Sequence, residues 1–361
     1  TDPYSRYSFR IGNNSSVDVP YFCLPWKIGA ICFGGLFSQV FYWIYDNYCA
    51  FRFIDGKQAK FDVLVTMQDY CPKCVLAAKR AGKLIWSDQI IENNASAIER
   101  MNRINSVYPF YEPVNFNDRV NEKIIGISDV VTVPNCQMNQ AVSRFLSKDG
   151  CVEIARYPLS LFNITKTEQK VRLDEQLVIL CRSNTARKGG ALILRALEIL
   201  PSEAPWIFEQ FSCISVRFLG VMDEFTENVM STLQLHPKIE IFAREYRFDD
   251  LIDYYGCGHM FVMCSIAEGS SLACLEAISV GLKVVITEHC GIDFLDVPEM
   301  GEVVELDEFG VAAGIAKVAV KLQNGMASGC FKSQRFSVNY TAQQYSDVVA
   351  RVVERLRNLT D

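Results

Sequence analysis

Residues 177–190, LVILCRSNTARKGG, contain a strand pattern, a polar turn and the start of a helix. The run LVILC has no polar residue, which is typical of a strand covered on both faces in a parallel sheet. The turn that follows is charged and ends in two glycines, and an apolar pattern of helical period continues to about residue 200. A strand, a turn and a helix in this order form the repeating unit of an α/β fold.

The same unit recurs on both sides of this stretch. Downstream, the expected strands are 215–220, 238–242, 260–264 and 283–287, and the expected helices are 188–200, 247–255 and 271–280. Upstream, the expected strands are 61–66, 83–87, 129–133 and 152–157, and the expected helices are 74–82 and 135–145. The polar segment 158–176 separates the two series. We therefore expect two Rossmann-like domains, 1–160 and 161–338, and a terminal amphipathic helix at 339–361.

Composition narrows the class of protein. The formal net charge of −6, without a long basic run, argues against a protein that neutralises many phosphates of DNA or RNA. The 14 cysteines lie mostly inside apolar runs, as expected for reduced thiols in the cytoplasm. Residues 28–45 carry no charge. They indicate a buried helix, a face that rests on a membrane, or a membrane span.

Two cations flank the turn after the strand at 177–182. Arg182 ends the strand, and Lys188 follows six residues later at the start of the helix. Ligands of parallel α/β sheets bind at the carboxyl ends of the strands. Two fixed cations beside a helix N-terminus therefore favour a diphosphate. The alternative is that Arg182, Arg187 and Lys188 are solvated turn residues.

The stretch EGSSLACLEA, residues 268–277, repeats this arrangement with carboxylates. It follows a buried strand pattern, and Ser270 or Ser271 is expected to begin the helix. The small residues let a phosphate approach the backbone amides closely. Eight helical residues rise about 12 Å, so Glu268 and Glu276 are placed to bind hydroxyls at opposite ends of a molecule with a diphosphate in its middle. A sugar nucleotide is such a molecule.

These motifs resemble the nucleotide-sugar domain of family 4 glycosyltransferases, which are retaining enzymes with the GT-B fold. The resemblance rests on RSNTARKGG at 182–190, on the E-x7-E motif at 268–276, and on GLKVVITEHCGIDF at 281–294. It covers residues 177–310 well and the first domain more loosely. It implies an α/β protein with two Rossmann-like domains that face a central cleft, and a C-terminal helix that crosses back to the N-terminal domain.

The resemblance also implies roles for individual residues. Arg182 and Lys188 are implied to hold the donor diphosphate, Glu268 the hydroxyls of the donor sugar, and Glu276 the ribose. The backbone amides of four residues are implied to face the phosphates and the sugar: Gly269, Ser270, Ser271 and Leu272. In the implied reaction the leaving phosphate takes the acceptor proton, and the two cations stabilise the departing diphosphate. Such a reaction needs no metal and no cofactor, and the expected donor is a UDP- or GDP-sugar.

The first domain departs from the family pattern. No strand and glycine-rich loop precede Tyr7, so either the first strand is missing from this sequence or the loop is built differently. The histidine that many members carry after the strand at 83–87 is also absent. Asp88 stands in that neighbourhood and is a candidate for contacting the acceptor or the sugar. Asp69 is a second candidate, and either aspartate could instead cap a helix.

Together these features predict a cytoplasmic glycosyltransferase, of the hexosyltransferase type, that moves a sugar from a nucleotide-diphosphate sugar to an acceptor hydroxyl. The uncharged run 28–45 suggests a glycan or lipid-linked acceptor, as in surface polysaccharide or glycoconjugate assembly, and peripheral contact with the cytoplasmic membrane face. Two alternatives share the expected cleft. One is a degenerate, non-catalytic GT-B partner subunit, which the missing loop and histidine favour. The other is a GT-B epimerase that acts on a nucleotide sugar.

Overall fold

The computed structural model describes most of the chain. The described residues are 8–10, 16–18, 62–68, 72–90, 94–104, 118–156, 173, 176–245, 251–292, 300–324 and 338–358. The run 28–45, Asp69, the expected domain boundary near residue 160 and nearly all of the segment 158–176 lie outside them. The chain divides into two compact units, residues 1–64 with 70–84 and residues 65–69 with 85–361.

The first unit contains a short hairpin and one described helix. In the hairpin, β1 (Ser8–Arg10) pairs antiparallel with β2 (Ser16–Asp18). Helix α2 (Pro72–Arg80) begins at a proline, which a first turn tolerates because the missing N–H would have no partner there. The chain leaves the helix through Gly82, whose φ of +72° lies in the left-handed region. The helix predicted from the pattern CVLAAKRAG is confirmed.

A four-stranded sheet has the order β3-β4-β5-β6, and the last three strands pair in parallel. Its strands are β3 (Val63–Met67), β4 (Leu84–Asp88), β5 (Val130–Val133) and β6 (Cys151–Ile154). The helices between them are α3 (Asn94–Arg103), α4 (Asp118–Ile127) and α5 (Cys136–Ser143). Asn135 caps α5, because its Oδ1 accepts a hydrogen bond from the amide of Met138 at 2.8 Å. All four strands were predicted, with ends that differ by a few residues.

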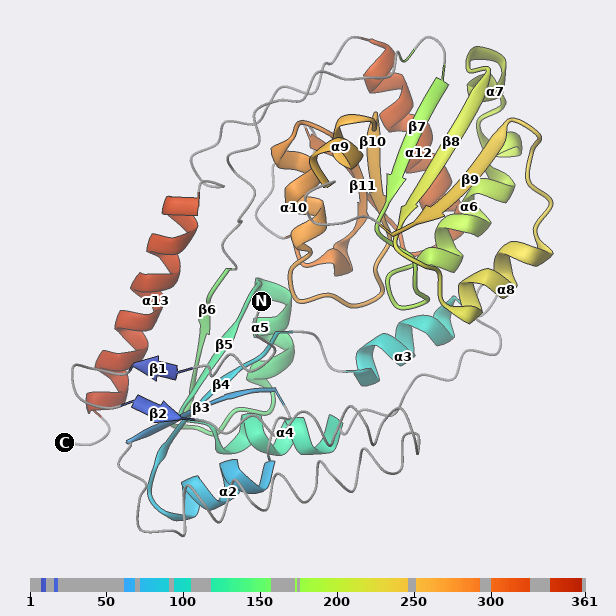
Figure 1. The fold of residues 1–361 in the computed structure, drawn as a ribbon. Coiled ribbons are helices and arrows are strands. Elements are labelled where there is room, and N and C mark those ends of the chain that lie inside the picture. The colour runs from blue at the N-terminus through green and yellow to red at the C-terminus, as the bar shows by residue number, and fades with distance from the viewer. Residues whose placement is uncertain are drawn as a thin grey trace. The chain divides into compact units, whose positions relative to one another are not determined.

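A six-stranded parallel sheet forms the larger part of the second unit (Figure 1). Its order is β12-β11-β10-β7-β8-β9, and all five neighbouring pairs are parallel. The strands are β7 (Gln176–Cys181), β8 (Cys213–Leu219), β9 (Ile239–Arg244), β10 (Met260–Met263), β11 (Lys283–Thr287) and β12 (Gly301–Val304). The chain therefore adds β8 and β9 on one side of β7, and β10, β11 and β12 on the other.

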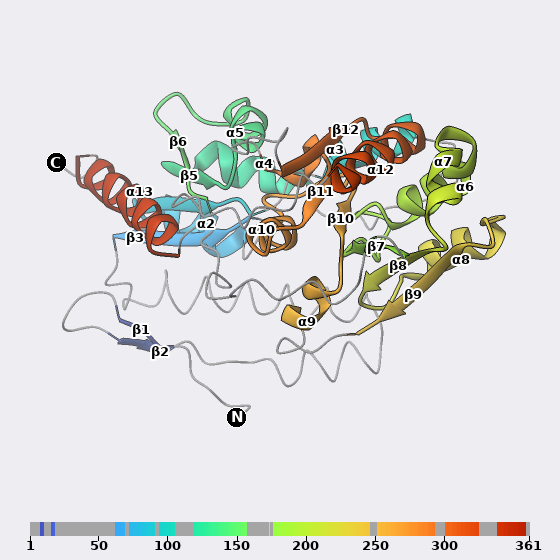
Figure 2. The ribbon, with the colours of Figure 1, turned by 90° about the horizontal axis from the view of Figure 1, so that it is seen from above.

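Helices cover both faces of this sheet. Side chains of β7 alternate between two hydrophobic clusters, with Leu177 and Ile179 in one and Val178 and Leu180 in the other. Figure 2 shows α6 and α12 on one side of the sheet and α9 on the other. The helices are α6 (Gly190–Glu203), α7 (Pro205–Gln210), α8 (Glu224–Thr232), α9 (Leu251–Gly256), α10 (Leu272–Ser279) and α12 (Glu308–Gln323). A parallel sheet buried on both faces is the predicted α/β architecture.

The C-terminal helix α13 (Val338–Asn358) packs on the four-stranded sheet. Arg351 forms an ion pair with Glu153 of β6, with Nη2 and Oε2 3.2 Å apart. Val348 and Val352 are buried on the apolar face of the helix. The amphipathic pattern predicted this helix, and the family resemblance predicted its contact with the N-terminal domain. None of the helices that the structure describes combines the length and apolar character needed to cross a bilayer.

Candidate active site

The site lies where strands β7 and β10 end. These strands are neighbours, with Cys181 opposite Val262, although β8 and β9 separate them along the chain. The order of the strands changes direction between them. Ligands of open α/β sheets bind at the carboxyl ends of the strands at such a switch point. The turn that holds Arg182 and Lys188 and the loop that holds Glu268 emerge at this edge of the sheet.

The turn after β7 is held tightly against β10. Gly189 has φ +81°, and a Cβ atom on it would lie 2.0 Å from the carbonyl oxygen of Cys264, so this position requires glycine. Asp223, which caps α8, also accepts a hydrogen bond from the amide of Ala186 at 2.8 Å. The turn therefore has one fixed shape before any ligand arrives.

The loop after β10 is fixed through its carbonyl groups. Three consecutive carbonyl oxygens each accept a hydrogen bond from a side chain: Ser265 from Thr287 at 2.7 Å, Ile266 from Arg100 at 2.7 Å, and Ala267 from Arg187 at 2.5 Å. The next amide, that of Glu268, donates to the carbonyl of His289 at 3.0 Å. The position of Glu268 is thus determined by contacts from several elements.

The N-terminus of α10 offers backbone amides to the site. Ser271 is the N-cap, as predicted, and its hydroxyl accepts from the amide of Cys274 at 3.3 Å. Its own amide donates to the carbonyl of Cys290 at 3.0 Å, so Ser271 supplies a cap and not a free amide. Within the part of the chain that is described, the amides of Gly269, Ser270 and Leu272 make no hydrogen bond. They and the helix dipole provide positive potential at this point.

Glu276 lies on α10 between a cation and a phenol. Its Oε2 is 3.5 Å from Nη1 of Arg182 and accepts a hydrogen bond from the hydroxyl of Tyr255 at 2.8 Å. Burial raises the pKa of the Glu276 carboxyl, while the Tyr255 hydrogen bond and the Arg182 charge act in the opposite direction. Both partners therefore favour the ionised carboxylate that burial disfavours.

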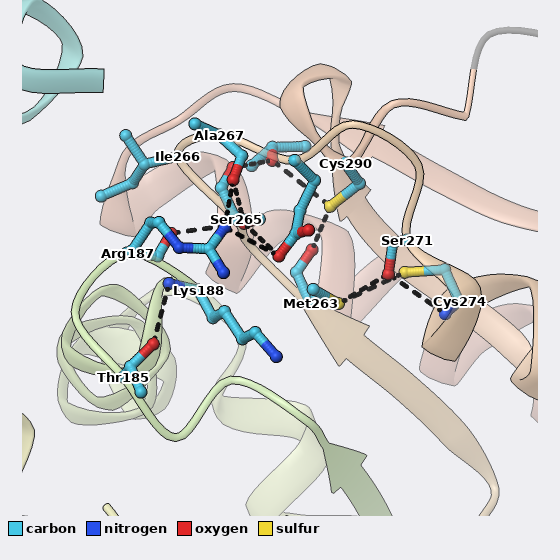
Figure 3. A network of polar contacts seen from close by, with 12 residues as sticks. Thr185, Arg187, Lys188, Met263, Ser265, Ile266, Ala267, Ser271, Cys274 and Cys290 are labelled. Carbon is cyan, nitrogen blue, oxygen red and sulfur yellow. Dashed lines mark hydrogen bonds and ion pairs between the residues drawn. The ribbon is translucent and has the colours of Figure 1, made fainter. Parts of the chain in front are cut away.

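Glu268 is paired in a similar way with the neighbouring loop. Its Oε1 is 3.1 Å from Nη1 of Arg187 and 3.4 Å from the hydroxyl of Ser265. Figure 3 shows Arg187 directed toward the loop at Ser265 and Ala267. The guanidinium spans the gap between the turn after β7 and the loop after β10.

Lys188 is a cation without a close partner among the described residues. Its ammonium makes no hydrogen bond or ion pair with the residues that the structure describes, and Figure 3 shows its side chain extending away from the network of polar contacts. Burial lowers the pKa of Lys188. The charge of Glu268 raises it, and the charges of Arg187 and Arg182 lower it further. An anion bound beside the ammonium of Lys188 would offset the free-energy cost of burying its charge.

Asp88 lies at the end of β4, on the other sheet. Its Oδ1 accepts a hydrogen bond from the hydroxyl of Thr132 at 2.7 Å, and Thr132 in turn accepts from Nε1 of Trp86 at 3.0 Å. Burial raises the pKa of Asp88, and the hydrogen bond from Thr132 opposes this shift. Asp88 therefore does not cap a helix in the described part of the structure. The structure gathers Arg182, Lys188, Glu268 and Glu276, whereas Asp88 belongs to a separate group.

Three residues of the site were not assigned from the sequence. Arg187 was considered only as a solvated turn residue, and Ser265 and Tyr255 were not considered. The available signal for Arg187 was its position beside Lys188, but its partner Glu268 lies 81 residues away. Among the described residues, no group of three or more histidine, cysteine, aspartate or glutamate side chains could hold a metal ion.

Comparison with known families finds a match for the part of the chain that forms the six-stranded sheet and its loops. Residues 175–321 match the family model described as glycosyl transferases group 1. The match contains all four of the gathered residues and the N-terminus of α10. No curated protein matches the sequence.

Several solved structures share the fold. Sucrose-phosphate synthase from Thermosynechococcus elongatus is similar with a TM-score of 0.61 at 14% identity, over 100% of this chain and 87% of that chain. HepE from Anabaena, solved with UDP, has a TM-score of 0.59 at 14% identity, over 84% and 82%. A UDP-forming α,α-trehalose-phosphate synthase from Burkholderia xenovorans has a TM-score of 0.57 at 13% identity, over 91% and 80%. The likeness shows the GT-B fold, which confirms the predicted fold class.

Proposed function

We propose that the protein is a retaining, family 4-like glycosyltransferase that transfers a sugar from a nucleotide-diphosphate sugar to an acceptor hydroxyl. One observation supports this above the others. Two cations, two carboxylates and the unbonded amides of α10 meet at the ends of β7 and β10. Cations and amides suit a diphosphate, and carboxylates suit the hydroxyls on either side of it.

Each residue has a role in the proposed donor complex. Lys188 and Arg182 bind the diphosphate, Glu268 accepts hydrogen bonds from the donor sugar, and Glu276 accepts them from the ribose. The free amides of Gly269, Ser270 and Leu272 face the phosphates, while Ser271 holds the helix cap. Arg182 contacts Glu276 at a distance of 3.5 Å, so the guanidinium has donors left for the phosphates.

The proposed reaction needs no nucleophile from the protein. The bond between the anomeric carbon and the β-phosphate oxygen breaks, and the acceptor oxygen bonds to the same face of the sugar. The acceptor proton passes to the departing phosphate oxygen, whose charge Arg182 and Lys188 stabilise. Asp88 is proposed to accept a hydrogen bond from an acceptor hydroxyl and so to orient it.

The donor and acceptor classes are also proposals. The donor is a UDP- or GDP-sugar, and the similar structures solved with UDP favour the first. The acceptor is a glycan or a lipid-linked glycan at the cytoplasmic membrane face, as in surface polysaccharide assembly. The uncharged run 28–45 supports the lipid-linked form. Liposome flotation tests it, and a protein that never floats with vesicles would argue against it.

A thermal-shift screen tests the donor site. UDP, GDP, ADP and TDP, each with its common sugars, are added to the wild type and to the variants Arg182→Ala, Glu276→Ala and Arg195→Ala. At a concentration of 100 times Kd, binding adds about 2.7 kcal/mol, or roughly 5–10 °C in Tm. We expect one nucleotide to raise Tm of the wild type and of the control variant Arg195→Ala. The same nucleotide should not raise Tm of Arg182→Ala or Glu276→Ala.

A wild type that responds to none of these compounds would contradict the proposal and favour the non-catalytic partner subunit. The variant Asp88→Asn distinguishes binding of the donor from transfer to the acceptor. It should keep the response to the donor and lose transfer to the acceptor, and a variant with full transfer activity would remove Asp88 from the reaction.

A further inference from the structure

Arg187 joins the two loops of the proposed donor site with both its side chain and its backbone. Its Nη1 contacts the carbonyl oxygen of Ala267 at 2.5 Å and Oε1 of Glu268 at 3.1 Å. Its own carbonyl oxygen accepts from the amide of Ile266 at 2.9 Å and from the hydroxyl of Ser265 at 3.3 Å. Among the described residues, every hydrogen bond of Arg187 therefore goes to the loop that carries Glu268.

These contacts leave the two oxygens of Glu268 in different states. Oε1 is engaged by Arg187 and by the hydroxyl of Ser265, which lies 3.4 Å away. Oε2 has no hydrogen-bond partner among the described residues. The side chain is 15% exposed, so it has little room to rotate. A carboxylate fixed at one oxygen presents the other in a single direction.

We propose that Arg187 is a positioning residue for recognition of the donor sugar, because it holds Glu268 so that one carboxylate oxygen faces a sugar hydroxyl. This inference rests on the proposed role of Glu268 and adds what sets the direction of its carboxylate. Arg187 thereby differs from Arg182 and Lys188. The guanidinium of Arg187 is committed to the protein, while the guanidinium of Arg182 and the ammonium of Lys188 are proposed to bind phosphate.

The inference predicts a loss confined to the sugar. A nucleoside diphosphate lacks the donor sugar and therefore has no hydroxyl for Glu268 to bind. Its affinity should be nearly independent of Arg187. The affinity for the matching sugar nucleotide should depend on both residues. A charge-assisted hydrogen bond to a fixed group changes affinity by about 10-fold or more, so the preference for UDP-glucose over UDP should fall by about 10-fold in Arg187→Gln.

Isothermal titration calorimetry with UDP and UDP-glucose measures this preference. If the wild type binds guanine or adenine nucleotides instead, GDP with GDP-mannose or ADP with ADP-glucose replaces the pair. The variants are Arg187→Gln, Glu268→Gln, their double variant and the control Arg195→Gln. Arg195 is a matched control because its Nη1 lies 3.0 Å from Oε2 of Glu198, with 32% of its side chain exposed against 31% for Arg187.

The double variant distinguishes positioning from a distant charge effect. If Arg187 acts through Glu268, the double variant loses no more preference for the sugar than Glu268→Gln alone, and the control keeps the wild-type preference. Arg187→Lys keeps the charge but has no planar fork to reach both acceptors. It should regain part of the preference, and it replaces Arg187→Gln if that variant does not fold.

Three results would overturn the inference. The first is an additive double variant, and the second is an Arg187 variant that weakens UDP and UDP-glucose equally, as a loop collapse would. The third is an unchanged preference in Arg187→Gln. A wild type that binds neither the nucleotide nor the sugar nucleotide would instead refute the proposed function itself, and the inference with it.

Discussion

Replacing Lys188 with methionine should stabilise the free protein and weaken its response to the donor. The ammonium of Lys188 has no hydrogen bond or ion pair with the described residues, and burial together with Arg187 and Arg182 disfavours its charge. Methionine has a similar length and no charge, so it keeps the packing of the stem and removes the cost of burying the ammonium.

The size of both effects follows from this environment. The side chain is only half-buried, so solvent screens much of the cost of its charge. We expect a gain of about 0.5–1 kcal/mol in the free energy of unfolding, which is within the range of gains that single stabilising substitutions commonly give. This corresponds to a rise of about 1–4 °C in Tm. Loss of a charged contact to the diphosphate costs about 1.5–3 kcal/mol, or roughly 10- to 150-fold in donor affinity.

Differential scanning fluorimetry with and without the donor measures both effects in one experiment. The pH dependence supplies an independent check. Because the pKa of Lys188 in the folded protein lies below its ordinary value of 10.5, the unfolded chain binds more protons between the two values. Stability of the wild type therefore rises with pH in that window. The advantage of Lys188→Met is complete below the folded-state pKa and shrinks as pH rises toward 10.5.

Two results would refute this reasoning. A Lys188→Met variant that melts below the wild type at neutral pH would show that the charge is compensated in the free protein. A variant that melts higher but still gains the full donor-induced shift would show that the diphosphate binds elsewhere.

Two further predictions concern the groups around these cations. Tyr255→Phe removes the hydrogen bond to Glu276 and should cost about 1–2 kcal/mol of stability at pH 7.5, measured by urea unfolding. Burial raises the pKa of Glu276 above its ordinary value of 4.5, so the native state binds the extra proton and loses stability as pH rises through that window. Removing the hydroxyl raises this pKa further, so the destabilisation should be smaller near pH 4.5 than at pH 7.5. Equal values would argue against a hydrogen bond to the carboxylate. Gly189→Ala should lower stability by about 2 kcal/mol or more, because its Cβ would approach the Cys264 carbonyl oxygen to 2.0 Å. Gly82→Ala is the control, with φ +72° but open space around its Cβ, and should cost about 1 kcal/mol; equal costs would show that backbone strain alone explains both.

The sequence predicted the regular core of the fold because burial leaves a clear pattern there. KVVIT was predicted as a strand and is β11 (Lys283–Thr287), since its β-branched run is buried at every position. Strand β12 and helix α12 were not predicted. The four residues GEVV of β12 are too few to show a period, and α12 carries Gly310 and Gly314 in its interior, which lowers its helix propensity.

The candidate site was predictable only as a set of positions. Arg182, Lys188 and Glu268 were identified because each follows a strand or opens a helix, and Glu276 because it lies eight residues after Glu268. Their pairing was not, because it depends on β10 lying beside β7 and not beside β9. That strand order brings Arg187 close to Glu268. It also brings Tyr255 of α9 close to Glu276 of α10. Spacing along one chain contains no direct record of such neighbours.

The strand order also sets when the site can form during synthesis. Arg187 is translated 81 residues before Glu268, which at about 5–20 residues per second is a delay of roughly 4–16 s. During this interval the apolar edge of β7 that β10 will occupy is open, and the cationic turn has neither of its carboxylates. Until β10, β11 and β12 have been synthesised, the nascent domain therefore exposes a strand edge that can pair with other strands and a cationic turn that can bind polyanions.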